Sequence, residues 1–214
     1  MKILLTAFDP FADEKINPTL EVLKKLEDNI LDVQLIKLEL PTVFDKSSKI
    51  LEEKIKEVKP DVILSLGQAG GRSKITVERI AINVDDANIK DNEGNKPIDQ
   101  KIKNDGENAY FSTLPIKAIV EEIKKAGIPA EISNSAGTFV CNHIMYEDLY
   151  LAEKYGNIKA GFIHIPFLPE QVIDKKDMPS MNISDIKKAL EIAIATIIKF
   201  SNKYDLKING GSTH

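Results

Sequence analysis

Short apolar segments alternate with segments of helical periodicity along almost the whole chain, and this alternation limits the fold more than any other feature. Strand-like segments are residues 2–7, 33–40, 61–66, 130–133 and 159–165. Segments with helical spacing of apolar residues are 18–26, 46–59, 115–125, 142–155 and 184–200. Such alternation produces a mostly parallel sheet covered by helices on both faces. We therefore expect an α/β fold: a three-layer sandwich around a twisted, mostly parallel sheet, in one domain over residues 1–214, with a frayed tail from about residue 201.

Residues 76–108 depart from this alternation. Residues 76–84 alternate with period two and predict a single strand, although no crossover helix precedes it. The face of this strand that we expect to be buried carries Glu78 together with Ile80, Ile82 and Val84. Residues 85–108 are polar and unusually long for a connection, which is typical of a functional or partly disordered loop.

Charge and hydropathy exclude several classes of protein. The formal net charge is -4 and lysine is spread along the chain, so we expect no nucleic-acid partner. No apolar run reaches the roughly 18 to 20 residues of a membrane span, and the start of the chain has no leader pattern. We therefore expect a cytoplasmic protein that does not bind membranes.

The cysteine and histidine content limits the chemistry. One cysteine excludes an internal disulfide. With three histidines beside it, the chain has too few ligands for a thiolate zinc site. A metal site built from carboxylates stays open, but no spacing of acidic residues indicates one. We expect neither a metal nor a cofactor.

Cys141 is the first candidate for chemistry. It lies between the strand 130–133 and the helix that follows, at or just before the helix N-terminus. The unpaired N–H groups there favour a thiolate and would also stabilise the oxyanion of an attacked amide. The alternative is a small buried residue without a chemical role, since free cysteine is often buried.

A nucleophilic thiol needs a base, and three histidines are available. His214 lies in the tail, and His143 points about 200° away from Cys141 on a helix. His164 ends the strand 159–165, and the carboxyl ends of strands carry ligands in α/β sheets. Cys141 also follows the end of a strand, so we expect the two to meet at one edge of the sheet. A structural, hydrogen-bonded histidine is the alternative.

The third group of such an array is an acid that orients the imidazole. Glu78 is the candidate, because a carboxylate on a buried face needs a partner. A histidine would serve; an ion pair with Arg72 or Arg79 is the alternative.

Two loops at the expected carboxyl edge have a composition suited to ligands. Residues 67–72 contain three glycines but match neither the phosphate-binding loop nor the dinucleotide fingerprint. Phe8 and Phe11 directly follow the first strand and would wall an apolar pocket, or belong to the core.

Several longer motifs carry a family resemblance. They are Thr6-Ala7-Phe8-Asp9-Pro10-Phe11, Asn17-Pro18, residues 67–72, 75–83, 109–115, 133–142 and 161–167, and Pro169-Glu170-Gln171. With these motifs the chain resembles the pyroglutamyl peptidase I (pyrrolidone-carboxylate peptidase) family from Lys2 to about Phe200. The blocks around Glu78 and Cys141 are the specific ones.

The resemblance implies a cytosolic, homotetrameric cysteine peptidase with an α/β fold of the phosphorylase/hydrolase type. Its substrates would be peptides with an N-terminal pyroglutamyl residue, cleaved through a thioester. On matching positions, Cys141 would be the nucleophile, His164 the general base and acid, and Glu78 the residue that orients His164. The substrate pocket would be formed by Phe8, Phe11, Gln68, Phe139 and Val140. A compact neutral lactam suits an apolar slot with a few hydrogen-bonding groups.

One position departs from the family pattern. The family usually has an arginine where this chain has Asn88, and that arginine is thought to assist at the substrate carbonyl. We therefore expect an active enzyme with weaker electrostatic assistance there. Two other functions stay open: a protein that binds the lactam without cleaving it, and a phosphorylase of similar fold that uses the glycine-rich loop for phosphate.

Overall fold

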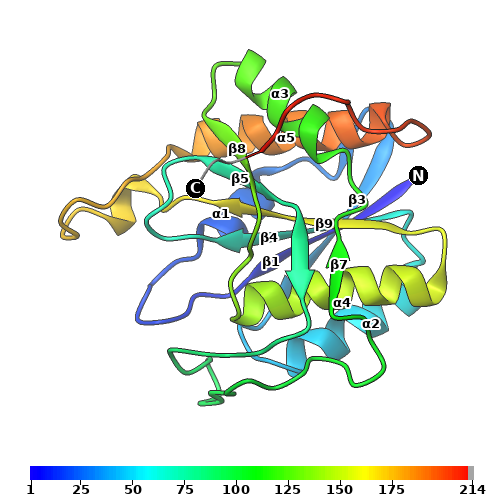
Figure 1. The fold of residues 1–214 in the computed structure, drawn as a ribbon. Helices are drawn as coiled ribbons and strands as arrows, with labels where there is room; N and C mark the ends of the chain where they lie inside the picture. The colour runs from blue at the N-terminus through cyan, green and yellow to red at the C-terminus, as the bar shows by residue number, and fades with distance from the viewer. Residues whose placement is uncertain (212–214) are drawn as a thin grey trace.

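A seven-stranded sheet forms the centre of the computed structural model, which describes residues 1–211 (Figure 1). Its strands are β1 (Lys2–Phe8), β2 (Asn29–Ile30), β3 (Val33–Leu40), β4 (Val62–Gln68), β5 (Ile75–Glu78), β8 (Ala130–Ser133) and β9 (Lys159–Ile165). The spatial order is β2-β3-β1-β4-β9-β5-β8. Strands β3, β1, β4 and β9 are parallel neighbours, whereas β2 and β5 run antiparallel to β3 and β9. The predicted α/β fold with a mostly parallel sheet is confirmed.

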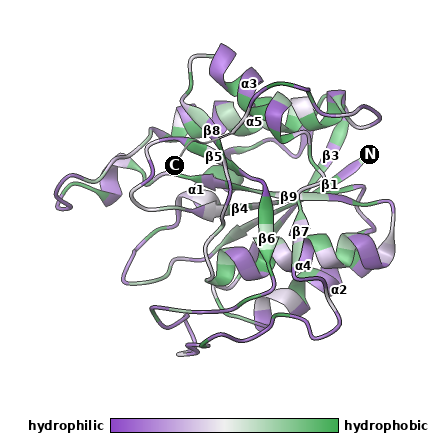
Figure 2. Ribbon diagram, in the orientation of Figure 1, coloured by the Kyte–Doolittle hydropathy of each residue, from purple (hydrophilic) through white to green (hydrophobic). Residues whose placement is uncertain are grey.

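Helices cover both faces of this sheet. One face is covered by α1 (Pro18–Lys25), α3 (Ile116–Lys125) and α5 (Ile183–Lys199), whose apolar residues share one core. The other face is covered by α2 (Lys46–Val58) and α4 (Val140–Tyr155), which share a second core. A short 3₁₀ helix, η1 (Pro169–Gln171), follows β9. Figure 2 shows hydrophobic and hydrophilic residues interleaved along these helices, as expected when one side of each packs on a sheet.

Side chains cap the N-termini of α1 and α3. Asn17 caps α1 by accepting a hydrogen bond from the backbone N–H of Thr19 at 3.1 Å. At α3 the capping carboxylate comes from far along the chain: Asp205 accepts from the backbone N–H groups of Lys117 and Ala118 at 2.9 and 3.0 Å. The expected frayed tail is therefore wrong for the segment around Asp205. Residues 212–214, which include His214, lie outside the described part of the chain.

The strand predicted over residues 76–84 is wrong, because the chain changes sheets at Arg79. Strand β5 ends at Glu78, and the Arg79 N–H donates to the Ser133 carbonyl at 2.9 Å. The next strand, β6 (Ile80–Ile82), pairs with β7 (Ala109–Phe111) in a separate antiparallel ribbon. Ile82 is therefore 37% exposed and does not share the buried face of Glu78.

Residues 85–108 contain no helix or strand, but polar contacts hold them in place. A β-bridge joins Asp85 to Gln100. The Asp91 carboxylate accepts hydrogen bonds from the backbone N–H groups of Phe44, Glu93 and Asn95 at 3.1, 2.9 and 2.8 Å. This segment therefore packs against the residues that precede α2.

Two further properties concern classes of protein considered from the sequence. None of the helices within residues 1–211 combines the length and apolarity needed to cross a bilayer. The same residues contain no cluster of three or more His, Cys, Asp or Glu side chains that would hold a metal ion.

Asp148 is a buried acid in α4 with an unusual environment. It is 0% exposed, and within residues 1–211 neither carboxylate oxygen has a hydrogen-bond partner. Burial raises the pKa of Asp148 well above its ordinary value, and the nearby Ser65 hydroxyl offsets only part of this effect. The folded protein therefore holds this proton at a pH where the unfolded chain releases it.

We expect Asp148→Asn to stabilise the protein at neutral pH. A raised pKa in the folded state means that stability is highest below the unfolded pKa and decreases as the pH rises toward the folded pKa. The substitution removes the free-energy cost of keeping Asp148 protonated in the folded state. It should raise Tm by about 2–4 °C at neutral pH and above. Thermal unfolding at several pH values measures the difference, which should vanish near pH 4 or about one unit below it. A Tm difference that does not depend on pH would contradict this explanation.

Candidate active site

Cys141 is the second residue of α4 and lies over strand β4. The helix begins after Phe139, whose carbonyl accepts the first helical hydrogen bond from the His143 N–H at 3.1 Å. A Cβ atom on Gly67 would lie 2.9 Å from the Cys141 Sγ and 2.7 Å from the Phe162 ring. Since real Cβ atoms do not approach other atoms so closely, the helix mouth reaches the sheet only because residue 67 is glycine.

His164 lies on the same face of the sheet as the thiol. It is the register partner of Gly67 in the parallel pair β4–β9, and parallel partners present side chains to the same face. Phe162, two residues earlier on β9, has its ring centroid 4.8 Å from that of His164. Within residues 1–211 no hydrogen bond joins the Cys141 Sγ to His164, so the two groups share a site without direct pairing.

Glu78 orients the His164 ring through a short hydrogen bond. The Nδ1 atom of His164 lies 2.7 Å from Oε1 of Glu78. Both side chains are nearly inaccessible, at 5% and 0% exposure. With Nδ1 bonded to the carboxylate, the second ring nitrogen, Nε2, is not engaged by Glu78.

Arg72 shares the same carboxylate oxygen. Its Nη1 lies 2.7 Å from Glu78 Oε1 and 2.7 Å from the Thr76 hydroxyl oxygen. The two partners considered for Glu78, a histidine and Arg72, therefore both bind it, whereas Arg79 donates to the Gly210 carbonyl instead.

The pKa of Glu78 reflects these contacts. Burial acts to raise it, but the hydrogen bond and charge of His164, together with Ser133 and Arg72, outweigh burial and lower the pKa below its ordinary value. Glu78 is therefore ionised at neutral pH.

The pKa of the Cys141 thiol is shifted upward. Burial, the largest cause, and the negative charge of Glu78 together raise the pKa of Cys141 to about 12, against the lowering effect of Arg72. A helix N-terminus favours a thiolate, but here desolvation has the larger effect. The direction of this shift opposes the prediction of an ionised resting thiol, although the Cys141 side chain is partly accessible.

The residues predicted to form a substrate pocket occupy different environments. Phe11 and Phe139 are half-buried, with ring centroids 6.1 Å apart. Phe8 and Val140 are buried in the core between the sheet and helices α2 and α4. Gln68 ends β4, and its side-chain carbonyl accepts a hydrogen bond from Gln171 at 2.9 Å. The structure therefore brings Phe11 and Phe139 together as an aromatic pair beside Cys141.

Sequence reasoning missed one aromatic residue of this group. The Phe44 ring packs edge-on against Phe139, with centroids 5.3 Å apart. Phe44 follows β3 just as Phe11 follows β1, and neighbouring parallel strands end at one edge of a sheet. The position of Phe44 just after a strand was the sequence feature from which its place in this group could have been predicted.

Known proteins are similar in sequence to this chain over their full length. A family model described as pyroglutamyl peptidase matches residues 1–200, which include Glu78, Cys141 and His164. A pyrrolidone-carboxylate peptidase of Streptococcus suis is 58% identical over 215 residues, and the match covers 100% of both chains. One from Finegoldia magna is 60% identical, again over 100% of both chains.

The chain belongs to the pyroglutamyl peptidase family.

Solved structures of this family have the same fold. The crystal structure of pyroglutamyl peptidase I from Bacillus amyloliquefaciens superimposes with a TM-score of 0.93 at 47% identity, covering 97% of this chain and 99% of that one. For the pyrrolidone carboxyl peptidase from Thermococcus litoralis the TM-score is 0.94 at 38% identity, with the same coverage. The resemblance inferred from the sequence motifs is confirmed, and with it the fold of the pyroglutamyl peptidases.

Proposed function

We propose that this member of the pyroglutamyl peptidase family hydrolyses the amide bond after an N-terminal pyroglutamyl residue. In this proposal Cys141 is the nucleophile, His164 is the general base and acid, and Glu78 orients His164. The observation that carries the proposal is the 2.7 Å contact between His164 and Glu78 on the face of the sheet where Cys141 opens α4. A nucleophile, a base and an orienting acid at one site are the parts of a cysteine peptidase.

The proposed reaction has two halves. The Sγ atom attacks the pyroglutamyl carbonyl as the thiol proton passes to Nε2 of His164, and backbone N–H groups at the start of α4 stabilise the oxyanion. His164 then gives this proton to the departing amine, which leaves a thioester on Cys141. Water attacks the thioester while His164 takes its proton, and release of pyroglutamate restores the thiol. Glu78 stabilises the imidazolium in both halves.

The substrate fits the aromatic group beside the thiol. Pyroglutamate is a neutral lactam, so the Phe11 and Phe139 rings would contact its faces, and the Gln68 amide, whose oxygen is held by Gln171, would donate a hydrogen bond. Phe8 and Val140 would support this wall from the core. A peptide with a free α-ammonium group would lose hydration there without gaining a partner.

Hydrolysis of a chromogenic pyroglutamyl amide tests the function directly. We expect turnover in reducing buffer and its complete loss after iodoacetamide treatment, since the chain has one cysteine. Binding of the amide without turnover would instead support a lactam-binding protein. Cleavage of a nucleoside that requires phosphate would support the phosphorylase alternative.

The pH dependence of alkylation tests the state of the thiol. Because burial raises the pKa of Cys141, the thiolate fraction should increase roughly tenfold per pH unit from about pH 6 to about pH 10. Iodoacetamide alkylation of the wild type, followed by mass spectrometry, should therefore accelerate throughout this range. A plateau with a midpoint below neutral pH would indicate a preformed thiolate–imidazolium pair instead.

Asn88 gives a test of the substrate carbonyl site. Its side chain is exposed, and it is neutral where the family usually has arginine. We expect Asn88→Arg to raise kcat/KM by about 10-fold, the order of effect of one added charged donor in a transition state. Steady-state kinetics on the pyroglutamyl amide measure this; an unchanged or lower kcat/KM would show that residue 88 does not act at the carbonyl.

Assembly and compartment are proposed from the family resemblance. A homotetramer would cover exposed apolar side chains such as Phe111 on β7, which is 65% exposed. Light scattering should then give four times the chain mass of 23.8 kDa. The cytoplasm remains the compartment that we predict from the sequence.

A further inference from the structure

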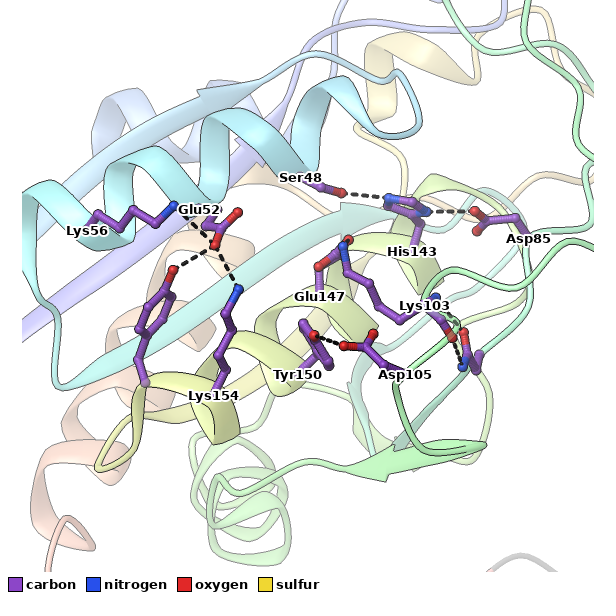
Figure 3. Close-up of polar contacts among 12 residues, drawn as sticks. Ser48, Glu52, Lys56, Asp85, Lys103, Asp105, His143, Glu147, Tyr150 and Lys154 are labelled. Atoms are coloured by element: carbon purple, nitrogen blue, oxygen red, sulfur yellow. Dashed lines mark hydrogen bonds and ion pairs between the residues drawn. The ribbon is translucent and has the colours of Figure 1, made fainter.

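A second histidine array lies beside the proposed active site, built from Ser48, His143 and Asp85. The Nδ1 atom of His143 lies 2.8 Å from Oδ2 of Asp85, and its Nε2 lies 2.6 Å from the Ser48 hydroxyl oxygen (Figure 3). Ser48 lies on α2, His143 on α4 and Asp85 in the segment after β6. The order hydroxyl–imidazole–carboxylate is that of a serine hydrolase triad.

Burial argues against a second catalytic centre. His143 is 0% exposed, and Ser48 and Asp85 are 7% and 6% exposed. A cavity of about 660 Å³ beside α2 is lined by Asp85, but neither Ser48 nor His143 lines it. A substrate therefore cannot reach the hydroxyl, and both ring nitrogens of His143 are already engaged.

The array is connected to the substrate side of the site by aromatic contacts. The Phe44 ring packs edge-on against His143 at a centroid distance of 5.5 Å and edge-on against Phe139 at 5.3 Å. Phe139 in turn lies 6.1 Å from Phe11 and directly precedes the turn that carries Cys141. His143 therefore supports the Phe44 ring, and Phe44 in turn supports the aromatic wall formed by Phe139 and Phe11.

The nucleophile itself is held by a different set of bonds. Asn142 accepts from the Ile82 N–H at 3.0 Å and donates to the carbonyls of Ile82 and Val84 at 2.9 and 3.0 Å. These bonds fasten the first turn of α4 without His143. Disturbing the His143 ring should thus move the pocket wall and leave Cys141 in place.

We propose that His143, locked by Ser48 and Asp85, is a positioning residue that holds Phe44 against Phe139 and so sets the shape of the pyroglutamyl pocket. This inference rests on the proposed function. A buried ring nitrogen that loses its partner costs free energy, so removing either bond of His143 would loosen the orientation of its ring. The array therefore acts on substrate binding, and the bond-breaking groups act separately.

Ser48→Ala tests this role with the smallest change. It removes the partner of Nε2, so the ring and Phe44 gain freedom, and KM for a pyroglutamyl amide should rise roughly 10-fold, the effect of a poorly filled pocket. The value of kcat should stay within about twofold, because the chemical groups are untouched. The rate of Cys141 alkylation by iodoacetamide should be the same as in the wild type.

Thr196→Val is the matched control. Thr196 is a buried residue of α5 on the opposite face of the sheet, and its hydroxyl donates to the Ile192 carbonyl at 2.7 Å. The variant Thr196→Val therefore loses one buried hydrogen bond, as Ser48→Ala does, but its KM should equal that of the wild type. Asp85→Asn is the second variant: its amide oxygen still accepts from Nδ1, so KM should rise less than in Ser48→Ala. If Ser48→Ala does not fold, the KM of Asp85→Asn is compared with that of the wild type: a small rise supports the proposal, and an unchanged KM overturns it.

The outcomes separate the two proposals. A rise in KM in Ser48→Ala that is absent in Thr196→Val supports positioning by His143. An unchanged KM, or a fall in kcat with constant KM, overturns it. If the wild type does not turn over the amide, the proposed function fails; the Kd for pyroglutamic acid amide, measured by calorimetry on the same variants, then decides the role of the array.

Discussion

Cys141→Ser should lower kcat/KM for a pyroglutamyl amide on the order of 10⁴-fold or more. The hydroxyl is a far weaker nucleophile than sulfur, and the site is built for a group that lies against Gly67 at the mouth of α4. Steady-state kinetics with a chromogenic amide measure the loss. Because the substitution is nearly isosteric, thermal unfolding should show a Tm close to that of the wild type.

Substrate binding provides the control for Cys141→Ser. The variant should still bind pyroglutamic acid amide with a Kd near the wild-type value, since the aromatic wall is unchanged. Turnover within tenfold of the wild type would exclude Cys141 as the nucleophile, whatever the role of His164.

Glu78→Gln should reduce kcat by about 10²- to 10⁴-fold, the range found when a triad loses its acid. The neutral amide cannot stabilise the imidazolium, and its NH₂ group would favour the wrong tautomer of His164. The charge of Arg72, left without its partner 2.7 Å away, would oppose protonation of His164 as well. KM should change little, since Glu78 does not face the substrate.

Glu131→Gln is the matched control for this substitution. Glu131 lies on the neighbouring strand β8 and pairs with Lys74 in solvent, so the same chemical change there should leave kcat unchanged. A similar loss in both variants would contradict the proposed role of Glu78.

The pH dependence of stability gives Glu78→Gln a second readout. The folded pKa of Glu78 lies below the ordinary value of 4.5, so its stabilising contacts act above that pH and are lost as the pH falls through the folded pKa. The Tm difference between the wild type and Glu78→Gln should therefore be largest near neutral pH and shrink in acid.

The regular elements were largely predictable from the sequence. Strands β3, β8 and β9 have the predicted bounds, because apolar runs flanked by turns leave few alternatives. The exchange of sheets at Arg79 was not predictable: period-two alternation persists through it, since β6 finds a new partner in β7. Local pattern does not report which sheet a strand joins.

The candidate site was predicted through an argument that holds only in part. Cys141 and His164 were expected to meet because both follow strands that end at one edge of the sheet. The sheet reverses at β5, however, and β8 runs antiparallel to β9, so β8 ends toward the opposite edge. The loop 134–139 brings the chain back, and α4 then starts over Gly67. The raised pKa of Cys141 was also not predictable, because burial depends on the whole fold.

This reversal has a consequence for the newly made chain. Strand β5 carries Glu78, and β8 leads into the loop that precedes Cys141, whereas β9 carries His164. The two groups of strands meet only where Thr76 pairs with His164 and Val77 with Ile163. The imidazole lies 86 residues from Glu78 in the chain, so no local fragment contains both. A half-folded chain therefore lacks the proposed pair of Glu78 and His164, which can form only when β5 and β9 have come together.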